Sequence, residues 1–174
     1  MKLQNNTIFI TYNPDNALEQ TLASRLHTIG AVNGFRMYLP DRFNSDSLLD
    51  SETERRINLS DYFILFSFGK LSEMVRQEIE TAYNHLQDPS HIIVIYDRQK
   101  GKNLVGNLTN HFTAFDFDPI TDNSSELVQR IINSILHQQL AHERSKRENS
   151  QAMNALLGIG LGLFTLAALS KSER

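Results

Sequence analysis

The sequence predicts an α/β protein: a flavodoxin-like five-stranded parallel sheet with flanking helices, followed by a C-terminal apolar helix. Five short apolar segments alternate with helical patterns over about 140 residues, as in doubly wound folds. Two of these segments, 62–68 and 92–96, are apolar on both alternating positions, which is typical of strands covered on both faces. The chain is 40% hydrophobic and 21% charged and has no cysteine, so we expect a packed core without disulfides.

The first strand and helix are marked by the residues that bound them. Residues 7–12 (TIFITY) are mostly β-branched or aromatic and end before Asn13, so they predict a buried strand. Asn16, followed three residues later by Glu19, forms a capping-box pattern that begins a helix. Gly30 is its expected stop. Four apolar residues recur at helical spacing along it: Leu18, Leu22, Leu26 and Ile29.

A polar loop follows the second strand. Residues 35–39 (FRMYL) predict that strand, which ends at Pro40. Residues 41–47 are rich in Asn, Asp and Ser, so they predict a long loop rather than core. A weaker helical pattern follows over 48–59, where one face carries Leu49, Thr53 and Ile57.

The rest of the predicted domain repeats the alternation of strand and helix. Residues 62–68 are expected to form the central strand, and Ser72 is placed to cap the next helix. Two further strands are expected at 92–96 and about 113–117. The last helix begins after residue 124 or 125. The expected buried stripes of these two helices are Val75, Ile79, Ala82 and Leu86, and then Val128, Ile131, Ile132 and Ile135.

Residues 1–140 form one predicted domain, and residues 141–174 form a tail of different composition. The domain carries 12 basic and 17 acidic side chains, and the tail carries 5 basic and 3 acidic ones. Residues 152–169 of the tail are uncharged and would form a helix about 27 Å long, at the short end of what spans a bilayer. Two interpretations stay open: the tail attaches the protein to the inner face of a membrane, or it mediates self-association.

Composition and motifs exclude several functions. A net charge of −3 offers no basic field for nucleic acid. No secretory signal is visible, so a cytoplasmic location is expected. No GxxxxGK[ST] phosphate loop occurs, and the turn 13–16 has no glycine, which disfavours a Rossmann dinucleotide site there. The six histidines lack the spacing of metal ligands, so no metal site is expected.

Three segments match motifs of a known family, in order and at fitting separations. Residues 8–12 (IFITY) resemble its first-strand box, usually F-I-S-Y. Residues 57–67 (INLSDYFILFS) resemble its I-x-x-S-D-x-x-I segment, and residues 72–82 (SEMVRQEIETA) resemble S-x-W-V-x-x-E-I-x-x-A. Over about residues 7–135, the chain therefore resembles the Toll/interleukin-1 receptor (TIR) domain family in its bacterial, NAD-cleaving branch.

Enzymatic members of this family cleave the nicotinamide glycosidic bond of NAD and yield nicotinamide with ADP-ribose or a cyclised or transferred product. The resemblance therefore implies that NAD is a substrate rather than a resident cofactor, and it maps the family's catalytic glutamate to Glu78. It also implies a homo-oligomer that is active on assembly. The expected setting is bacterial antiphage defence or signalling, with a downstream effector protein as a further partner.

The residues around Glu78 support a role beside the resemblance. Glu78 lies at the edge of the buried stripe of its helix without a helical cation partner, whereas Glu80 has Arg76 four residues earlier. Cleavage of a ribosyl bond to a cationic leaving group builds positive charge at the anomeric carbon, which a carboxylate stabilises. Nicotinamide leaves as a neutral base, so no general acid is required. The alternative is that Glu78 is a solvated helix residue.

Four further residues are candidate substrate contacts, each with a structural alternative. Tyr12 offers a ring for stacking, or it is a core residue with a wet hydroxyl. Asp41 and Phe43 match the loop that closes over substrate in the TIR family, or they are plain loop residues. Ser67 ends the central strand and is placed to bond a ligand or to cap the strand locally.

Asn13 and Met74 are also candidate substrate contacts, but they depart from the family pattern. The family often has a basic residue at the position of Asn13 and usually a tryptophan at that of Met74, which predicts a softer, less stacked pocket. Thr11 replaces the serine of the first box. These departures leave open a second hypothesis, a non-catalytic TIR interaction scaffold. A third is an enzyme like the nucleoside ribosyltransferases.

Overall fold

The computed structural model describes residues 6–42, 49–101, 112–142 and 144–145. The chain divides into two compact units, residues 1–129 and 130–174. The first unit contains the whole sheet. Phe43 and the apolar segment 152–169 lie outside the described residues, and so the predictions made for them are not addressed by the structure. No helix within the described ranges is both long and apolar enough to cross a membrane.

The five predicted strands form one parallel sheet in the order β2-β1-β3-β4-β5. This confirms the predicted fold class, and β3 occupies the central position that its apolar pattern predicts. The strands end within one or two residues of their predicted limits: β1 is Thr7–Thr11, β2 is Arg36–Tyr38, β3 is Tyr62–Ser67, β4 is Ile92–Asp97 and β5 is Thr113–Phe117.

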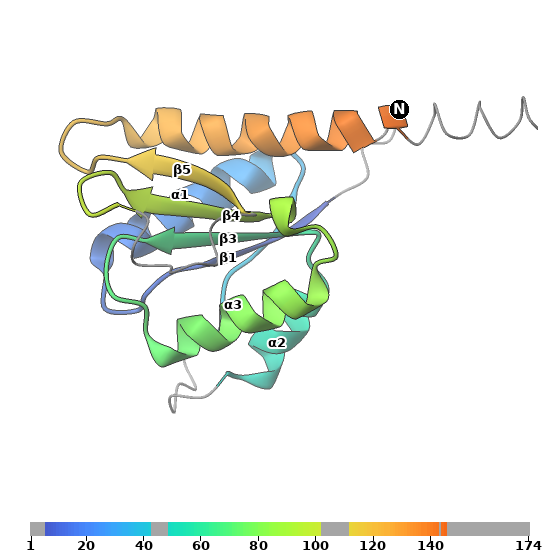
Figure 1. The fold of residues 1–174 in the computed structure, drawn as a ribbon, viewed down its shortest axis with the longest axis horizontal. Helices are drawn as coiled ribbons and strands as arrows, with labels where there is room; N and C mark the ends of the chain where they lie inside the picture. The colour runs from blue at the N-terminus through green and yellow to red at the C-terminus, as the bar shows by residue number, and fades with distance from the viewer. Residues whose placement is uncertain (1–5, 43–48, 102–111, 143, 146–174) are drawn as a thin grey trace, which may run out of the picture. The chain divides into compact units, whose positions relative to one another are not determined.

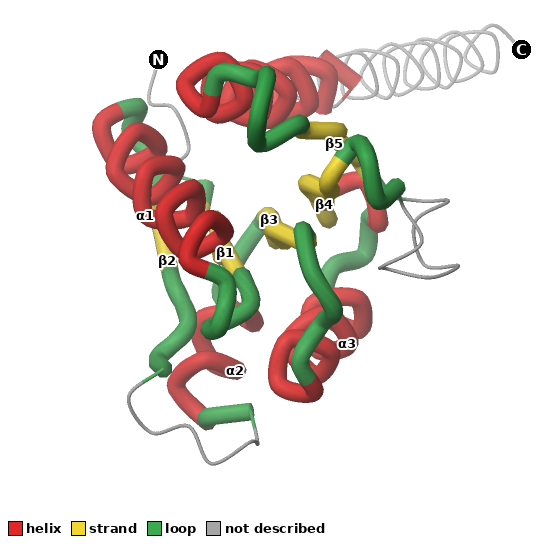
Figure 2. Tube along the Cα trace, turned by 90° about the vertical axis from the view of Figure 1, so that its left-hand side faces the viewer, coloured by secondary structure: helices red, strands yellow, loops and turns green. Residues whose placement is uncertain are grey.

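Helices cover the two faces of the sheet (Figure 1). Helix α1 (Ala17–Val32) packs on one face, and α2 (Ser51–Asn58) and α3 (Glu73–His85) pack together on the other, as the view turned by 90° shows (Figure 2). A short 3-10 helix, η1 (Pro89–His91), precedes β4. Residues 124–142 are helical, as predicted, and the four apolar residues expected to turn inward there are buried.

The core follows from the alternation of side chains along the strands, because successive residues face opposite sides of a sheet. The rings of Phe9 and Phe63 stack on the side of α3, with centroids 5.7 Å apart. One buried cluster on that side joins the strands to α2 and α3: Phe9, Ile57, Phe63, Leu65, Val75, Ile79, Ala82, Ile92 and Val94. The intervening residues are at most 1% exposed: Ile8, Ile10, Ile64, Phe66, Ile93 and Ile95.

The prediction that Gly30 ends α1 was wrong, because the helix continues to Val32. Gly30 is buried inside the helix, and a Cβ added to it would lie 2.6 Å from Sδ of Met37 on β2. Glycine is therefore used there for close packing rather than as a stop. The turn is made by Gly34, whose φ of +88° is unfavourable for other residues. Leu18, expected on the buried face, is 37% exposed.

The stacked Phe9–Phe63 pair gives a test of this core. We expect Phe63→Ala to lower the free energy of unfolding by about 3–5 kcal/mol, because it removes a buried ring and leaves a cavity. Ile120→Ala is the control, since Ile120 is 85% exposed and its truncation should change stability by less than about 0.5 kcal/mol. Urea denaturation measures both. Equal effects would contradict the assigned core.

Candidate functional site

The candidate site lies at the carboxyl edge of the sheet, at the point where the order of successive strands across the sheet reverses. The chain runs from β1 to β2 on one side and then returns to β3 on the other side of β1. In doubly wound sheets, ligands bind outside the strand ends at such a switch point. A cavity of about 470 Å³ opens there, lined by residues 13–18 after β1 and by Gly69, Lys70 and Ser72 after β3.

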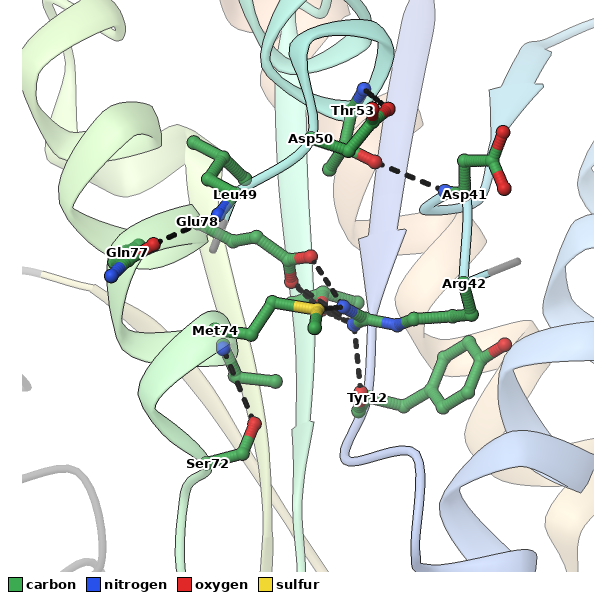
Figure 3. A network of polar contacts seen from close by, with 12 residues as sticks. Tyr12, Asp41, Arg42, Leu49, Asp50, Thr53, Ser72, Met74, Gln77 and Glu78 are labelled. Carbon is green, nitrogen blue, oxygen red and sulfur yellow. Dashed lines mark hydrogen bonds and ion pairs between the residues drawn. The ribbon is translucent and has the colours of Figure 1, made fainter. Parts of the chain in front are cut away.

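Glu78 projects from α3 toward the end of β1, and its side chain has no solvent exposure. The hydroxyl of Thr11, the last residue of β1, donates a hydrogen bond to Oε2 of Glu78. Nη1 of Arg42 donates to Oε1 at 2.7 Å, and Nη2 donates to Oε2 at 3.2 Å. The carboxylate is therefore paired with a guanidinium through both of its oxygens (Figure 3), the geometry that Arg forms best.

Arg42 reaches this carboxylate from the loop that follows β2. Its Nη2 also donates to the carbonyl oxygen of Tyr12 at 3.1 Å and to Oγ1 of Thr11 at 3.2 Å. Nη1 contacts Sδ of Met74. The carbon Cζ lies 5.6 Å from the centroid of the Tyr12 ring, within the range of a cation–π interaction. Hydrogen-bond acceptors and one aromatic face therefore surround the guanidinium.

Tyr12, Met74 and Glu78 are thus brought together, and Arg42 is the residue that joins them (Figure 3). The three belong to the set that the sequence assigns to the site. The alternative that Glu78 is a solvated helix residue is wrong, because its side chain is fully buried. The predicted stacking surface of Tyr12 faces a cation of the protein itself.

Asp41 and Ser67 take no part in this cluster. The backbone N–H of Asp41 donates to Oγ1 of Thr53 at 3.0 Å, and the Asp41 side chain points away from the guanidinium in Figure 3. Ser67 is fully buried at the end of β3, and its Oγ has no hydrogen-bond partner among the described residues. The assignment of these two residues as substrate contacts therefore stays a prediction.

Asn13 is held by a second buried carboxylate, that of Glu19. Oε2 of Glu19 accepts the backbone N–H of Asn13 at 2.7 Å, and Oε1 accepts that of Phe68 at 2.7 Å. Nδ2 of Asn13 donates to Oε2 at 2.9 Å, and its Oδ1 accepts the backbone N–H of Ser72 at 3.0 Å. These bonds tie the loop after β1 to the loop after β3, so the Asn13 side chain holds the edge of the cavity together.

The predicted capping box at the start of α1 is only half formed. Oδ1 of Asn16 accepts the backbone N–H of Glu19 at 3.2 Å, as the pattern predicts. The Glu19 carboxylate does not accept the backbone N–H of Asn16, which donates to the carbonyl oxygen of Asn13; its donors are Nδ2 of Asn16 at 3.0 Å and the groups of Asn13 and Phe68. A residue expected to act locally therefore connects the loops that follow β1 and β3.

Burial raises the pKa of both buried carboxyl groups, Glu19 and Glu78. It raises the pKa of Glu78 above its ordinary value, against the opposing effects of the Arg42 charge and the hydrogen bonds from Thr11 and Arg42. It also raises the pKa of Glu19, against the N–H groups of Asn13 and Phe68. Both side chains therefore hold a proton more tightly than an exposed glutamate does.

Sequence reasoning did not assign Arg42 or Thr11 to the site. One signal pointed to Arg42: it is the single basic residue between 39 and 50, and Glu78 lacks a cation on its own helix. A carboxylate at the edge of a buried stripe needs a partner from elsewhere in the chain. Thr11 follows Phe9 by two residues, so strand alternation turns it toward α3 as well.

Comparison with known proteins identifies no family for this chain. No family model matches the sequence, and a search of curated proteins finds no match. Within the described ranges, no three or more acidic or histidine side chains gather in a way that could hold a metal ion. The fold and the site together define an α/β protein whose sheet edge carries a buried carboxylate paired with a guanidinium.

Glu19 should be a structural residue. We expect Glu19→Gln to lower the free energy of unfolding by about 2 kcal/mol, because an amide nitrogen replaces an oxygen that accepts buried N–H groups. The matched control is Glu80→Gln on the exposed face of α3, expected to change stability by less than about 0.5 kcal/mol. Urea unfolding monitored by circular dichroism measures both, and equal values would contradict the bridging role.

The raised pKa of Glu78 predicts a pH-dependent contribution to stability. Between pH 4.5, the ordinary pKa of a glutamate, and the raised pKa of Glu78, the folded protein binds a proton at Glu78 more tightly than the unfolded chain does. Lowering the pH in this range therefore stabilises the folded protein. Glu78→Gln has no such proton. We expect the free energy of unfolding of the wild type, relative to Glu78→Gln, to rise as the pH falls from about 7 to about 5. A fall would mean that Arg42 outweighs burial.

Proposed function

We propose that this chain is a TIR-type NAD nucleosidase, active on assembly, in which Glu78 is the catalytic carboxylate. The observation that carries the proposal is that Glu78 lies at the carboxyl edge of the sheet, fully buried, and binds a planar cation beside an aromatic ring. The resemblance of residues 72–82 to the family motif makes the same residue the catalytic one.

The chemistry requires a carboxylate that faces developing positive charge. Heterolysis of the bond between C1′ of the ribose and the pyridinium nitrogen sends the electron pair to that nitrogen, and nicotinamide leaves as a neutral molecule. The ribosyl oxocarbenium that remains is stabilised by the Glu78 carboxylate. Water then attacks C1′ and releases a proton, which gives ADP-ribose. The cyclised and transferred products arise when another nucleophile replaces water.

The neighbouring residues fit the parts of the substrate. The Tyr12 ring already accepts a planar cation at 5.6 Å, which suits the pyridinium of NAD. The cavity of about 470 Å³ is not lined by Tyr12 or Glu78, but its lining begins at Asn13, the residue after Tyr12, and we propose that it holds the rest of the dinucleotide. Lys70 is the one basic residue among those that line the cavity, and α1 and α3 begin at its edge. Helix N-termini and a lysine favour a pyrophosphate.

The biological setting follows from the resemblance. Family enzymes complete their active sites with a second protomer, so we propose a homo-oligomer in the cytoplasm with the tail either self-associating or contacting the membrane. NAD depletion or a nucleotide signal to a downstream effector would then serve antiphage defence or signalling. No resident cofactor is proposed, since NAD is consumed.

A non-catalytic TIR scaffold is the second candidate, and one specific observation favours it. Arg42 pairs with both oxygens of Glu78, and the Glu78 side chain has no exposure. A purely structural ion pair would look the same, and removal of either partner would then affect only stability.

Nicotinamide release from NAD by the purified full chain separates these candidates. With a crowding agent or detergent to promote assembly, we expect release by the wild type and a loss of kcat of about a hundredfold in Glu78→Gln. The matched control is Glu80→Gln, two residues further along α3 and exposed. Its kcat should stay within about twofold of the wild-type value.

Three outcomes would contradict the proposal. Absence of release from assembled wild-type protein favours the scaffold. Release that persists in a folded Glu78→Gln variant assigns the chemistry to another residue. Transfer of a base between free nucleosides, without NAD cleavage, favours a nucleoside ribosyltransferase.

A further inference from the structure

The surroundings of the Arg42 guanidinium form a receptor for a planar cation. Among the described residues, every polar atom that contacts it is an acceptor: both oxygens of Glu78, Oγ1 of Thr11, the carbonyl oxygen of Tyr12 and Sδ of Met74. The Tyr12 ring supplies an aromatic face at 5.6 Å from Cζ. A carboxylate combined with an aromatic face is a general means of binding delocalised cations.

The guanidinium fills this receptor incompletely. Nε of Arg42 is buried and has no hydrogen-bond partner among the described residues. A buried donor without an acceptor is unfavourable, and the described residues satisfy the two terminal nitrogens of Arg42 and not the third. A planar cation that lacks a donor at this position, such as an N-alkylated pyridinium, would not incur that penalty.

Arg42 also differs from the other members of the receptor in how it is held. Thr11 and Tyr12 lie at the end of β1, and Met74 and Glu78 lie on α3, so the packing of the sheet and the helix fixes them. Arg42 belongs to neither a strand nor a helix, and its side chain is 15% exposed. The guanidinium is therefore held in place by its own side-chain contacts and not by the packing of a helix or a strand.

We propose that Arg42 is an internal ligand of a planar-cation site formed by Thr11, Tyr12, Met74 and Glu78, and that an external planar cation binds by displacing it. The identification of that cation as the pyridinium of an oxidised nicotinamide nucleotide rests on the function proposed above. Arg42 then competes with the substrate and lowers its apparent affinity, because only the fraction of molecules with the site vacated binds. The neutral dihydronicotinamide of a reduced nucleotide cannot replace the lost charge.

Binding of small probes to an Arg42 variant tests this without any need for cleavage. The probes are the 1-methylnicotinamide cation, methylguanidinium and neutral nicotinamide, and the readouts are the thermal midpoint and calorimetric binding. In Arg42→Ala, we expect both cations to raise the midpoint and to bind at least about tenfold more tightly than in the wild type. Neutral nicotinamide should have no effect.

Two further variants keep the test decisive. Arg42→Gln removes the charge while keeping much of the side chain, so it replaces Arg42→Ala if that variant does not fold. Glu78→Gln combined with either substitution removes the carboxylate and should abolish cation binding. Equal cation binding with and without Glu78, or no cation binding in any folded Arg42 variant, would overturn the proposal and leave Arg42 as a structural partner of Glu78.

The binding experiment and the nicotinamide-release assay together separate this inference from the proposed function. Cation binding that depends on Glu78, together with no nicotinamide release by any variant, supports the cation site and contradicts the nucleosidase. Conversely, nicotinamide release with an unchanged KM in Arg42→Ala supports the nucleosidase and contradicts competition by Arg42.

Discussion

The contact between Glu78 and Arg42 is the interaction on which the candidate site depends. A carboxylate without solvent exposure is unstable as an ion unless a cation and hydrogen bonds replace water. Here Arg42 binds both oxygens and Thr11 binds one of them. The pair therefore holds the loop after β2 against α3 and the end of β1, and it determines whether Glu78 is available to any other molecule.

Glu19 and Glu78 are both buried at the same edge of the sheet, but their partners differ in kind. Glu19 is held by the backbone N–H groups of Asn13 and Phe68 and by the short side-chain amides of Asn13 and Asn16. Such donors cannot leave without unfolding the loops, so Glu19 is structural. Glu78 depends on a long side chain from an irregular segment, and that dependence is the basis of the displacement proposed above.

The topology of the sheet explains why both carboxylates lie at the edge where doubly wound folds bind ligands. Because β1 has β2 on one side and β3 on the other, the loops after β1 and β3 diverge around the cavity of about 470 Å³. Glu19 ties those two loops together, and Thr11 links the end of β1 to Glu78. The geometry of the site is therefore a consequence of strand order, not of any single motif.

The sequence by itself determined the elements, the class of sheet and the position of Glu78 on a partly buried helix face, because apolar periodicity and capping residues act over a few positions of the chain. It did not determine how far α1 extends past Gly30, which close packing against Met37 decides. Nor did it assign Arg42 to Glu78 or Glu19 to Phe68. These partners are 36 and 49 residues apart, and only the order in which the strands assemble brings them within hydrogen-bonding distance.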